Sequence, residues 1–403
     1  MKYIGFGSSR VSGVRVFPFH LFAFLLFILS GCVEEYEADI SSDDSGLLVV
    51  EGAICPGLNK FVLTRTLPIN SSYMPRMVTG ASVSVHGSDG SEYLMQEANG
   101  YYACSIDVLN PDATYYLRIE TDGEVYESEP QKPLPTEKIE EVSLAQETPE
   151  SNIDVLVTPE APVDPGKATY YSWTYDETWE VHPDYTTTIY FDIKTSSPVF
   201  DPYQFPSRGW KNMSSSTILV GNSRNYEGQH IRKLKLYDVD RADERVYYKY
   251  SGLIHQRTIS KAEYEYDLAR RQASSEMGGL FTPLPSALPS NIHCLTSKKH
   301  VIGFVGCSLN TSEYRFFLIP KDFSIKYTYP KDARRWLDDC TEWDCYLMVV
   351  KEGMYLCEWK DERYMPGGVL QTAWAYDYQL DVRLRGASAE EPEYWSLEEN
   401  FSY

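Results

Sequence analysis

Thr114-Tyr115-Tyr116-Leu117-Arg118-Ile119-Glu120 alternates apolar and polar side chains and runs into the turn residues Thr121-Asp122-Gly123. A period of two places one face of a β-strand on a core and the other face in solvent. Asp and Gly are the residues that tight turns favour. The stretch therefore predicts one arm of a β-hairpin, with Glu124–Ser128 as the returning strand.

The same short period recurs before this hairpin. Asn99-Gly100 is a strong two-residue turn between two further strands. Seven short strands at regular spacing predict a β-sandwich over residues 47–132. The run Val78–Tyr126 resembles the immunoglobulin-like or carboxypeptidase-regulatory-like modules of exported proteins, which implies binding or spacing rather than chemistry. The other expected strands are Leu47–Gly52, Lys60–Thr66, Ala81–Val85, Glu92–Gln96 and Tyr101–Ile106.

Prolines 130, 133 and 135 interrupt this pattern and mark a domain boundary, because proline disrupts sheet pairing. Residues 136–396 are expected to form a larger, β-rich domain. The chain holds 32 Tyr, 16 Phe and 8 Trp, and aromatic residues favour strands. The expected strands are Ile153–Val157, Thr169–Tyr175, Thr187–Phe191, Lys233–Tyr237, Val246–Tyr250, Val301–Val305 and Tyr314–Ile319.

One main helix is expected over residues 260–277. Ser260 and Glu263 have the spacing of a capping box, which satisfies two orphan backbone donors. Glu263, Glu265 and Asp267 occupy the early turns, which suits the helix dipole. We expect this helix to lie over a sheet with its acidic face in water. The predicted fold class is therefore mainly all-β with a single main helix.

Leu29-Ser30-Gly31-Cys32 ends an apolar run near the N-terminus. Residues 1–15 are basic, and the apolar core Leu21–Leu29 is shorter than the about 20 residues that a membrane span needs. This is the layout of a secretory signal over residues 1–31. The four residues resemble the lipobox of bacterial lipoproteins, which implies that Cys32 is acylated and becomes the mature N-terminus. The alternative is a plain signal peptide followed by a coincidental cysteine.

Residues 32–46 are acidic, small and poor in apolar side chains, so we expect a solvated tether. An acidic patch behind a lipidated cysteine is similar to the surface-export signal of Bacteroidota lipoproteins; a flexible spacer is the alternative. Loss of residues 1–31, with three basic residues and no acidic one, changes the net charge from −21 to −24. Such a charge excludes nucleic-acid binding through the net field of the protein.

Lipidation of Cys32 would leave seven of the eight cysteines. An exported protein meets oxidising conditions, so we expect disulfides and one thiol left over. The spacing Cys340-x₄-Cys345 is too loose to predict a zinc site, and no cofactor or metal is predicted. Cys55 and Cys104 fall in the same predicted domain and could pair, and Cys340, Cys345 and Cys357 could form one bridge, but the sequence does not determine the connectivity.

No catalytic constellation stands out. His293-Cys294 suggests a nucleophile, but no base follows at a defined spacing. The acidic stretch 238–244 offers oxygens to calcium yet lacks the register of a calcium loop, which favours a solvated turn. Tyr171, Trp173 and Trp179 have the chemistry to stack on sugars or peptides, although core packing is the default.

An ordered series of motifs resembles the Bacteroidota outer-membrane lipoproteins grouped as domain-of-unknown-function family 4249, over nearly the whole mature chain. That family lacks an assigned activity, and its members look like neighbours of TonB-dependent receptors, which implies an accessory role in uptake. The motifs are Leu48–Gly52, Tyr250-Ser251, Ile259–Tyr264, Gly278–Phe281, Pro289–Ile292, Val301–Phe304 and Pro392–Trp395.

We therefore expect a lipoprotein of the cell outer membrane that faces the exterior. The expected function is to bind a peptide or glycan, or to assist a TonB-dependent nutrient transporter, without enzymatic activity. Two other classes stay open: an extracellular hydrolase, and a structural or adhesive surface protein. A cleft holding two carboxylates with raised pKa values would favour the hydrolase.

Overall fold

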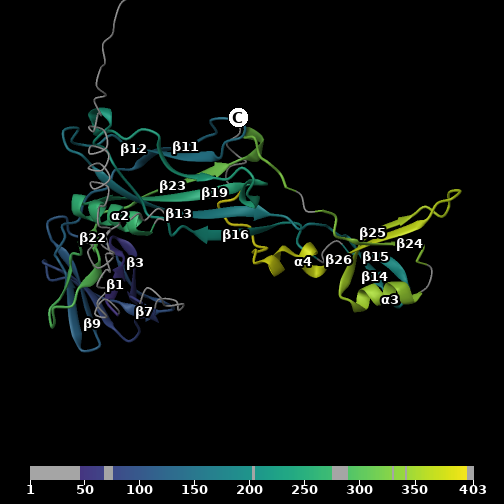
Figure 1. Cartoon of the computed structure of the whole chain (residues 1–403), viewed down its shortest axis with the longest axis horizontal. Helices are drawn as coiled ribbons and strands as arrows, with labels where there is room; N and C mark the ends of the chain where they lie inside the picture. The colour runs from purple at the N-terminus through teal and green to yellow at the C-terminus, as the bar shows by residue number, and fades with distance from the viewer. Residues whose placement is uncertain are drawn as a thin grey trace, which may run out of the picture. The chain divides into compact units, whose positions relative to one another are not determined.

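The computed structural model describes residues 46–67, 76–201, 205–274, 289–328, 331–340 and 343–396. In these ranges the fold is mainly β, as predicted (Figure 1). The predicted signal peptide 1–31, Cys32 and nearly all of the predicted tether lie outside the described residues. None of the helices in the described ranges has the length and apolar character needed to span a membrane.

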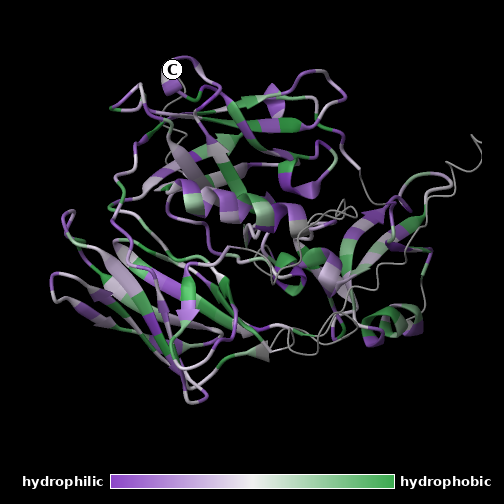
Figure 2. Cartoon of the chain, turned by 60° about the vertical axis from the view of Figure 1, so that its left-hand side comes forward, coloured by the Kyte–Doolittle hydropathy of each residue, from purple (hydrophilic) through white to green (hydrophobic). Residues whose placement is uncertain are grey.

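Two sheets enclose the first core. Their strands are β1 (Leu48–Glu51), β3 (Gly57–Arg65), β4 (Arg76–Met77), β5 (Ser82–Gly87), β6 (Glu92–Leu94), β7 (Gln96–Ala98), β8 (Tyr101–Ile106), β9 (Tyr115–Thr121), β10 (Glu124–Ser128), β20 (Ile292–Cys294) and β21 (Val301–Gly303). The sheet orders are β21-β1-β3-β8-β7, with β4 beside β3, and β20-β10-β9-β5-β6. On β9, Tyr115, Leu117 and Ile119 are each 1% exposed. Figure 2 shows the resulting alternation of hydrophobic and hydrophilic residues along the strands.

Each of these sheets takes an outer strand from a later part of the chain. β21 pairs in parallel with β1, so that Val50 lies opposite Gly303, and β20 pairs antiparallel with β10. Ile292, Val301 and Val305 thereby join the first core. The sequence predicts the strand near residue 301 but not this long-range pairing, and the proposed division at residues 132–136 stays a prediction.

Two further sheets share the second core. Their strands are β11 (Ile139–Ala145), β12 (Ile153–Pro159), β13 (Tyr170–Val181), β16 (Gly209–Ser214), β17 (Leu219–Asn222), β18 (Leu234–Val239), β19 (Tyr250–Ile259) and β23 (Ser312–Leu318). The larger sheet has the order β16-β13-β19-β23, with β17 beside β13, and the smaller one is β11-β12-β18. Tyr171, Trp173 and Trp179 are buried in this core, which confirms core packing for them.

The prediction of a strand over Val246–Tyr250 is wrong. Asp243 caps a short 3₁₀ turn, η3 (Glu244–Val246), by accepting a hydrogen bond from the backbone N–H of Arg245. The strand β19 begins only at Tyr250. Its alternation is hidden in the sequence because polar side chains on it are buried; Gln256, for example, accepts a hydrogen bond from the Trp173 indole at 2.8 Å.

The helix α2 (Lys261–Ser274) occupies the described part of the predicted helix. The Ser260 hydroxyl accepts from the Glu263 backbone N–H at 3.1 Å, as predicted. The Glu263 carboxylate, however, pairs with Arg257 of β19. The expectation of a wet acidic face is wrong for Glu263 and Asp267, whose side chains are 5% and 13% exposed, and holds for Glu265 at 55%.

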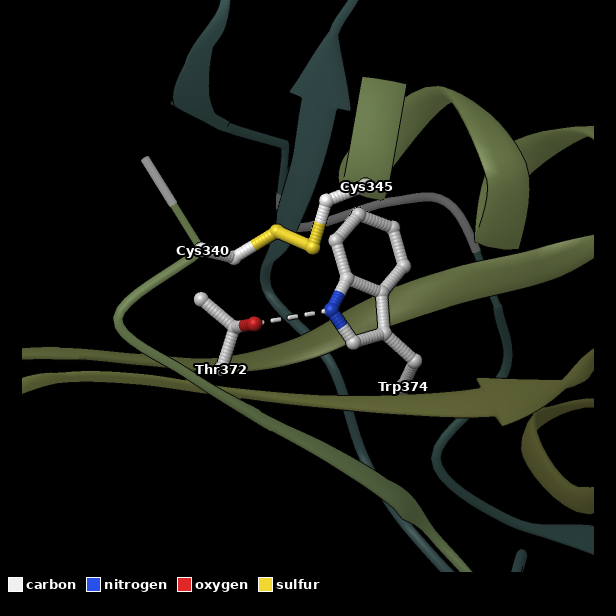
Figure 3. Close-up of a disulfide and its surroundings, with 4 residues drawn as sticks. All are labelled: Cys340, Cys345, Thr372 and Trp374. Atoms are coloured by element: carbon white, nitrogen blue, oxygen red, sulfur yellow. Dashed lines mark hydrogen bonds between the residues drawn. A yellow bond between two sulfur atoms is a disulfide. The ribbon is translucent and has the colours of Figure 1, made fainter. Parts of the chain in front are cut away.

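A third, smaller core lies between a three-stranded sheet, a hairpin and a helix. The elements are β14 (Ile189–Asp192), β15 (Ser197–Phe200), β24 (Arg335–Asp338), α3 (Trp343–Lys351), β25 (Met354–Asp361) and β26 (Leu370–Tyr376). A disulfide joins Cys340 to Cys345 beside Trp374, whose indole N–H donates to the Thr372 hydroxyl at 2.9 Å (Figure 3). The sequence does not predict α3.

The disulfide pattern is only partly as expected. Cys340–Cys345 is the one bridge expected among the three late cysteines, and Cys357 keeps its thiol. The pairing of Cys55 with Cys104 is wrong, because both are free thiols. The backbone at Cys55 is instead held by the Asn59 side chain, which accepts from its N–H at 2.9 Å and donates to its carbonyl at 2.7 Å.

Candidate functional site

A pocket of about 330 Å³, lined by both polar and apolar side chains, opens on one face of the larger second sheet. Strand register explains its composition, because directly opposite residues of antiparallel strands share a face. Asp176 of β13 lies opposite Ser214 of β16 and Leu253 of β19, and Leu253 lies opposite Arg315 of β23. These four side chains form one row across the sheet. The register thus brings an acidic and a basic residue to the same pocket.

A second row lies two residues further along the strands. Asn212, Thr178 and Ser251 are opposite one another on β16, β13 and β19. Tyr394, from the C-terminal segment, closes the pocket over this row: its hydroxyl lies 2.9 Å from the Thr178 hydroxyl, which donates to Asn212 Oδ1 at 2.7 Å. This chain of hydrogen bonds fixes the amide of Asn212, so that its N–H₂ group is oriented before any ligand arrives.

Arg315 is held flat against the Tyr394 ring. Its guanidinium carbon lies 3.6 Å from the ring centroid, and Nη1 donates to the Ser251 hydroxyl at 3.2 Å. Within the described ranges, no carboxylate oxygen lies within ion-pair distance of this guanidinium. A stacked guanidinium keeps its remaining N–H donors in a fixed plane, which is the geometry that recognises carboxylates.

Asp176, two strands away from Arg315 in the same row, is held from two sides. The Ser214 hydroxyl donates to Oδ1 at 2.6 Å, and His255 Nε2 lies 2.9 Å from Oδ2. His255 Nδ1 lies 3.0 Å from Glu313 Oε1. Partial burial raises the pKa of Asp176, but the contacts with Ser214 and His255 outweigh it and the pKa is lowered. Asp176 is therefore a carboxylate at neutral pH.

The order of these groups differs from that of a hydrolytic triad. In a triad the imidazole accepts the proton of the nucleophilic hydroxyl, and the carboxylate holds the other face of the imidazole. Here the Ser214 hydroxyl donates to the carboxylate of Asp176, and His255 lies between two carboxylates. The arrangement orients charges; it does not activate the serine.

The C-terminal segment that carries Tyr394 is held against the sheet by burial and hydrogen bonds of the neighbouring Trp395. Trp395 is 3% exposed; its indole N–H donates to Glu180 at 3.2 Å, and its carbonyl accepts from the Lys249 ammonium at 2.5 Å. The sequence marks Pro392–Trp395 as a family motif but not as a wall of a pocket. The aromatic pair Tyr394-Trp395, close behind Pro392, is the signal in the sequence that could have indicated a packed segment. The residues that it contacts could not be predicted without the register of the sheet.

The residues that the sequence suggested for other chemistry lie outside this pocket. His293 and Cys294 are neighbours on β20, so their side chains point to opposite faces; the His293 ring lies 3.1 Å from Glu129 and Cys294 Sγ lies 3.1 Å from the Ser297 hydroxyl. In the acidic stretch 238–244, Asp238 pairs with a lysine and Asp243 with an arginine. Cys32 lies outside the described residues.

The family described as Domain of unknown function (DUF4249) matches residues 33–314. This range holds β13, β16 and β19, whereas Arg315 and Tyr394 fall beyond it. The resemblance expected over nearly the whole mature chain therefore extends only to residue 314 in this match, and the motif 392–395 lies outside it. No match is found among curated proteins. Because the family match covers more than half of the length of this chain, the chain belongs to the DUF4249 family.

Proposed function

We propose that this protein is a lipid-anchored component of the outer membrane, facing the exterior, that binds a small polar ligand in the pocket beside Tyr394. In this proposal it acts without enzymatic activity, as an accessory partner of a TonB-dependent nutrient transporter. The observation that carries the proposal is the pocket itself: its charged and amide groups are already held in place, while its serine is not activated by the neighbouring histidine.

The proposed anchor is Cys32. A lipobox-like Leu29–Cys32 ends a short apolar core, and the acidic composition of residues 32–46 is that expected of a solvated spacer. Each buried lipid CH₂ contributes roughly 0.8 kcal/mol, and more than one acyl chain gives lasting attachment. The acidic spacer supports export to the surface in the manner of Bacteroidota lipoproteins.

The pocket supports binding of a small ligand. Sites for small molecules are concave, occupy about 300–1,000 Å³ and carry a few convergent polar groups that fix orientation. The pocket lies at the small end of that range. Ligand capture by an anchored protein near a receptor raises the local ligand concentration, which is the physical role of an accessory protein in uptake.

The anchor is tested by mass spectrometry of the native protein and of Cys32→Ala. We expect acyl groups on Cys32 and a variant that leaves the membrane fraction. A native N-terminus without acyl groups would contradict the anchor.

Binding is tested by thermal shift with pooled peptides and oligosaccharides, using the wild-type chain and Asn212→Ala. We expect a ligand that raises the Tm of the wild type but not of the variant. A deletion strain should then take up that ligand more slowly. Breakdown of the ligand by the purified protein would favour a hydrolase instead, and no shift with any pool would contradict binding.

A further inference from the structure

The acidic Asp176 and the basic Arg315 both line the pocket but do not form an ion pair with each other. Asp176 and Arg315 belong to one row and are separated by Leu253 on the strand between them. Neighbouring strands lie about 5 Å apart, so the two backbones are about 10 Å apart. In the described part of the chain no ion pair joins these two side chains within 4.0 Å. The pocket thus keeps a negative and a positive group apart across a cavity.

The positive end offers donors. Arg315 uses Nη1 for Ser251, and Asn212 uses its carbonyl oxygen for Thr178. Among the described residues, neither Nη2 of Arg315 nor Nδ2 of Asn212 has a hydrogen-bond partner. Donors of this kind, one charged and one neutral, fit the two oxygens of a carboxylate.

The negative end offers acceptors. Asp176 is ionised, and Ser214 and His255 take one lone pair on each of its oxygens. A carboxylate has about four acceptor positions, so each oxygen still accepts from a ligand. An ammonium group, with three donors and a positive charge, is the complementary partner.

We propose that the pocket binds a zwitterion, an amino acid or short peptide, with its carboxylate on Arg315 and Asn212 and its ammonium on Asp176. This inference rests on the proposed function as a binding protein. The net charge of −24 proposed for the mature chain favours the same choice, because the resulting negative field repels an acidic sugar but not a ligand without net charge.

The first test needs no variant. Calorimetric titration of the purified chain compares alanyl-alanine with its C-terminal amide, its N-acetyl form and glucuronate. We expect each blocked dipeptide to bind about 10–100-fold more weakly than the free one, because hydrogen bonds to charged groups contribute this much. Glucuronate should bind more weakly still. Equal binding of the amide, or tighter binding of glucuronate, would overturn the inference.

The second test pairs each end with its ligand group. Arg315→Gln should weaken binding of the free dipeptide but leave the affinity for the C-terminal amide unchanged. Asp176→Asn should also weaken binding of the free dipeptide but leave the affinity for the N-acetyl form unchanged. Arg363→Gln is the matched control, because Arg363 pairs with Asp361 and does not line the pocket. Variants that weaken the binding of every ligand equally would overturn the assignment of the two ends.

The zwitterion inference can fail while the proposed binding function holds. This is the outcome if other pooled ligands bind the wild type but not Asn212→Ala, and the dipeptide does not bind.

Discussion

The guanidinium of Arg257 lies 2.5 Å from the carboxylate of Glu263, and the two side chains are 18% and 5% exposed. The pair connects β19 to α2. A Cβ at position 306 would collide with the same carboxylate, so Gly306 is required for this close approach. A residue in the first turn of the helix thus serves as the counter-ion of a largely buried strand arginine.

Glu263→Gln should lower the free energy of unfolding by about 3 kcal/mol, because removing one partner of a buried pair leaves the other charge uncompensated. The matched control is Glu265→Gln on the same helix, where an exposed pair with Lys261 predicts a change under about 0.5 kcal/mol. Urea unfolding measures both. Equal effects of the two variants would contradict the role of Arg257.

Asp267→Asn should change how stability depends on pH. Burial raises the pKa of Asp267 to about 6, against 3.8 for a free side chain. Between these values the folded state binds more protons than the unfolded state, so this group makes stability fall as pH rises from about 4 to about 6. Unfolding at pH 4.5 and pH 7 measures the effect. From pH 4.5 to pH 7 the free energy of unfolding should fall less in the variant than in the wild type. If it changed equally in both proteins, Asp267 would not be the source of the pH dependence.

The free thiols should react with iodoacetamide in a fixed order at pH 8. Slight burial raises the pKa of Cys294, but hydrogen bonds with Ser297 and Thr296 outweigh it and the pKa is lowered. Burial raises the pKa of Cys357 to about 11 and that of Cys307 to about 12. The thiolate is the reactive form, so peptide mass mapping should find Cys294 modified first. After unfolding in urea the three rates should become similar.

Gly303→Ala should destabilise the junction of β1 and β21. Gly303 has φ +153° and a Cβ there would lie 2.5 Å from the Val50 carbonyl oxygen. Gly123, with φ +76° and open space around it, is the control for backbone strain alone. Because overpacking adds to that strain, Gly303→Ala should cost about 2 kcal/mol more than Gly123→Ala. Urea unfolding of the two variants checks the difference.

The sequence predicts those elements whose pattern is local. The period of two in Tyr115–Glu120 and the turn Asn99-Gly100 place the hairpins of the first sandwich, and Ser260 places the start of α2. The strand β19 is missed because its buried polar residues, such as Gln256, have partners on distant strands. Burial of Glu263 is missed for a different reason: Arg257 lies only six residues earlier, but the two side chains meet because the chain turns from β19 into α2 between them.

The pocket could not be predicted from the sequence, although most of its residues are ordinary polar side chains. Ser214, Asp176, Leu253 and Arg315 come from four strands, and only the register across the sheet places them in one row. A shift of one residue would turn each of these side chains to the other face. Register is set by the whole core, and a single stretch of sequence does not contain it.

The parallel pairing of β21 with β1 has a consequence for biosynthesis. A ribosome releases the chain from its N-terminus, so the outer edges of β1 and β10 have no partner until residues 292–303 have emerged. Exposed strand edges pair readily with other chains, and contacts over so long a sequence separation form slowly. The first core is therefore completed only after residues 292–303 have been synthesised, and until then the unpaired edges of β1 and β10 can accept a strand from another chain.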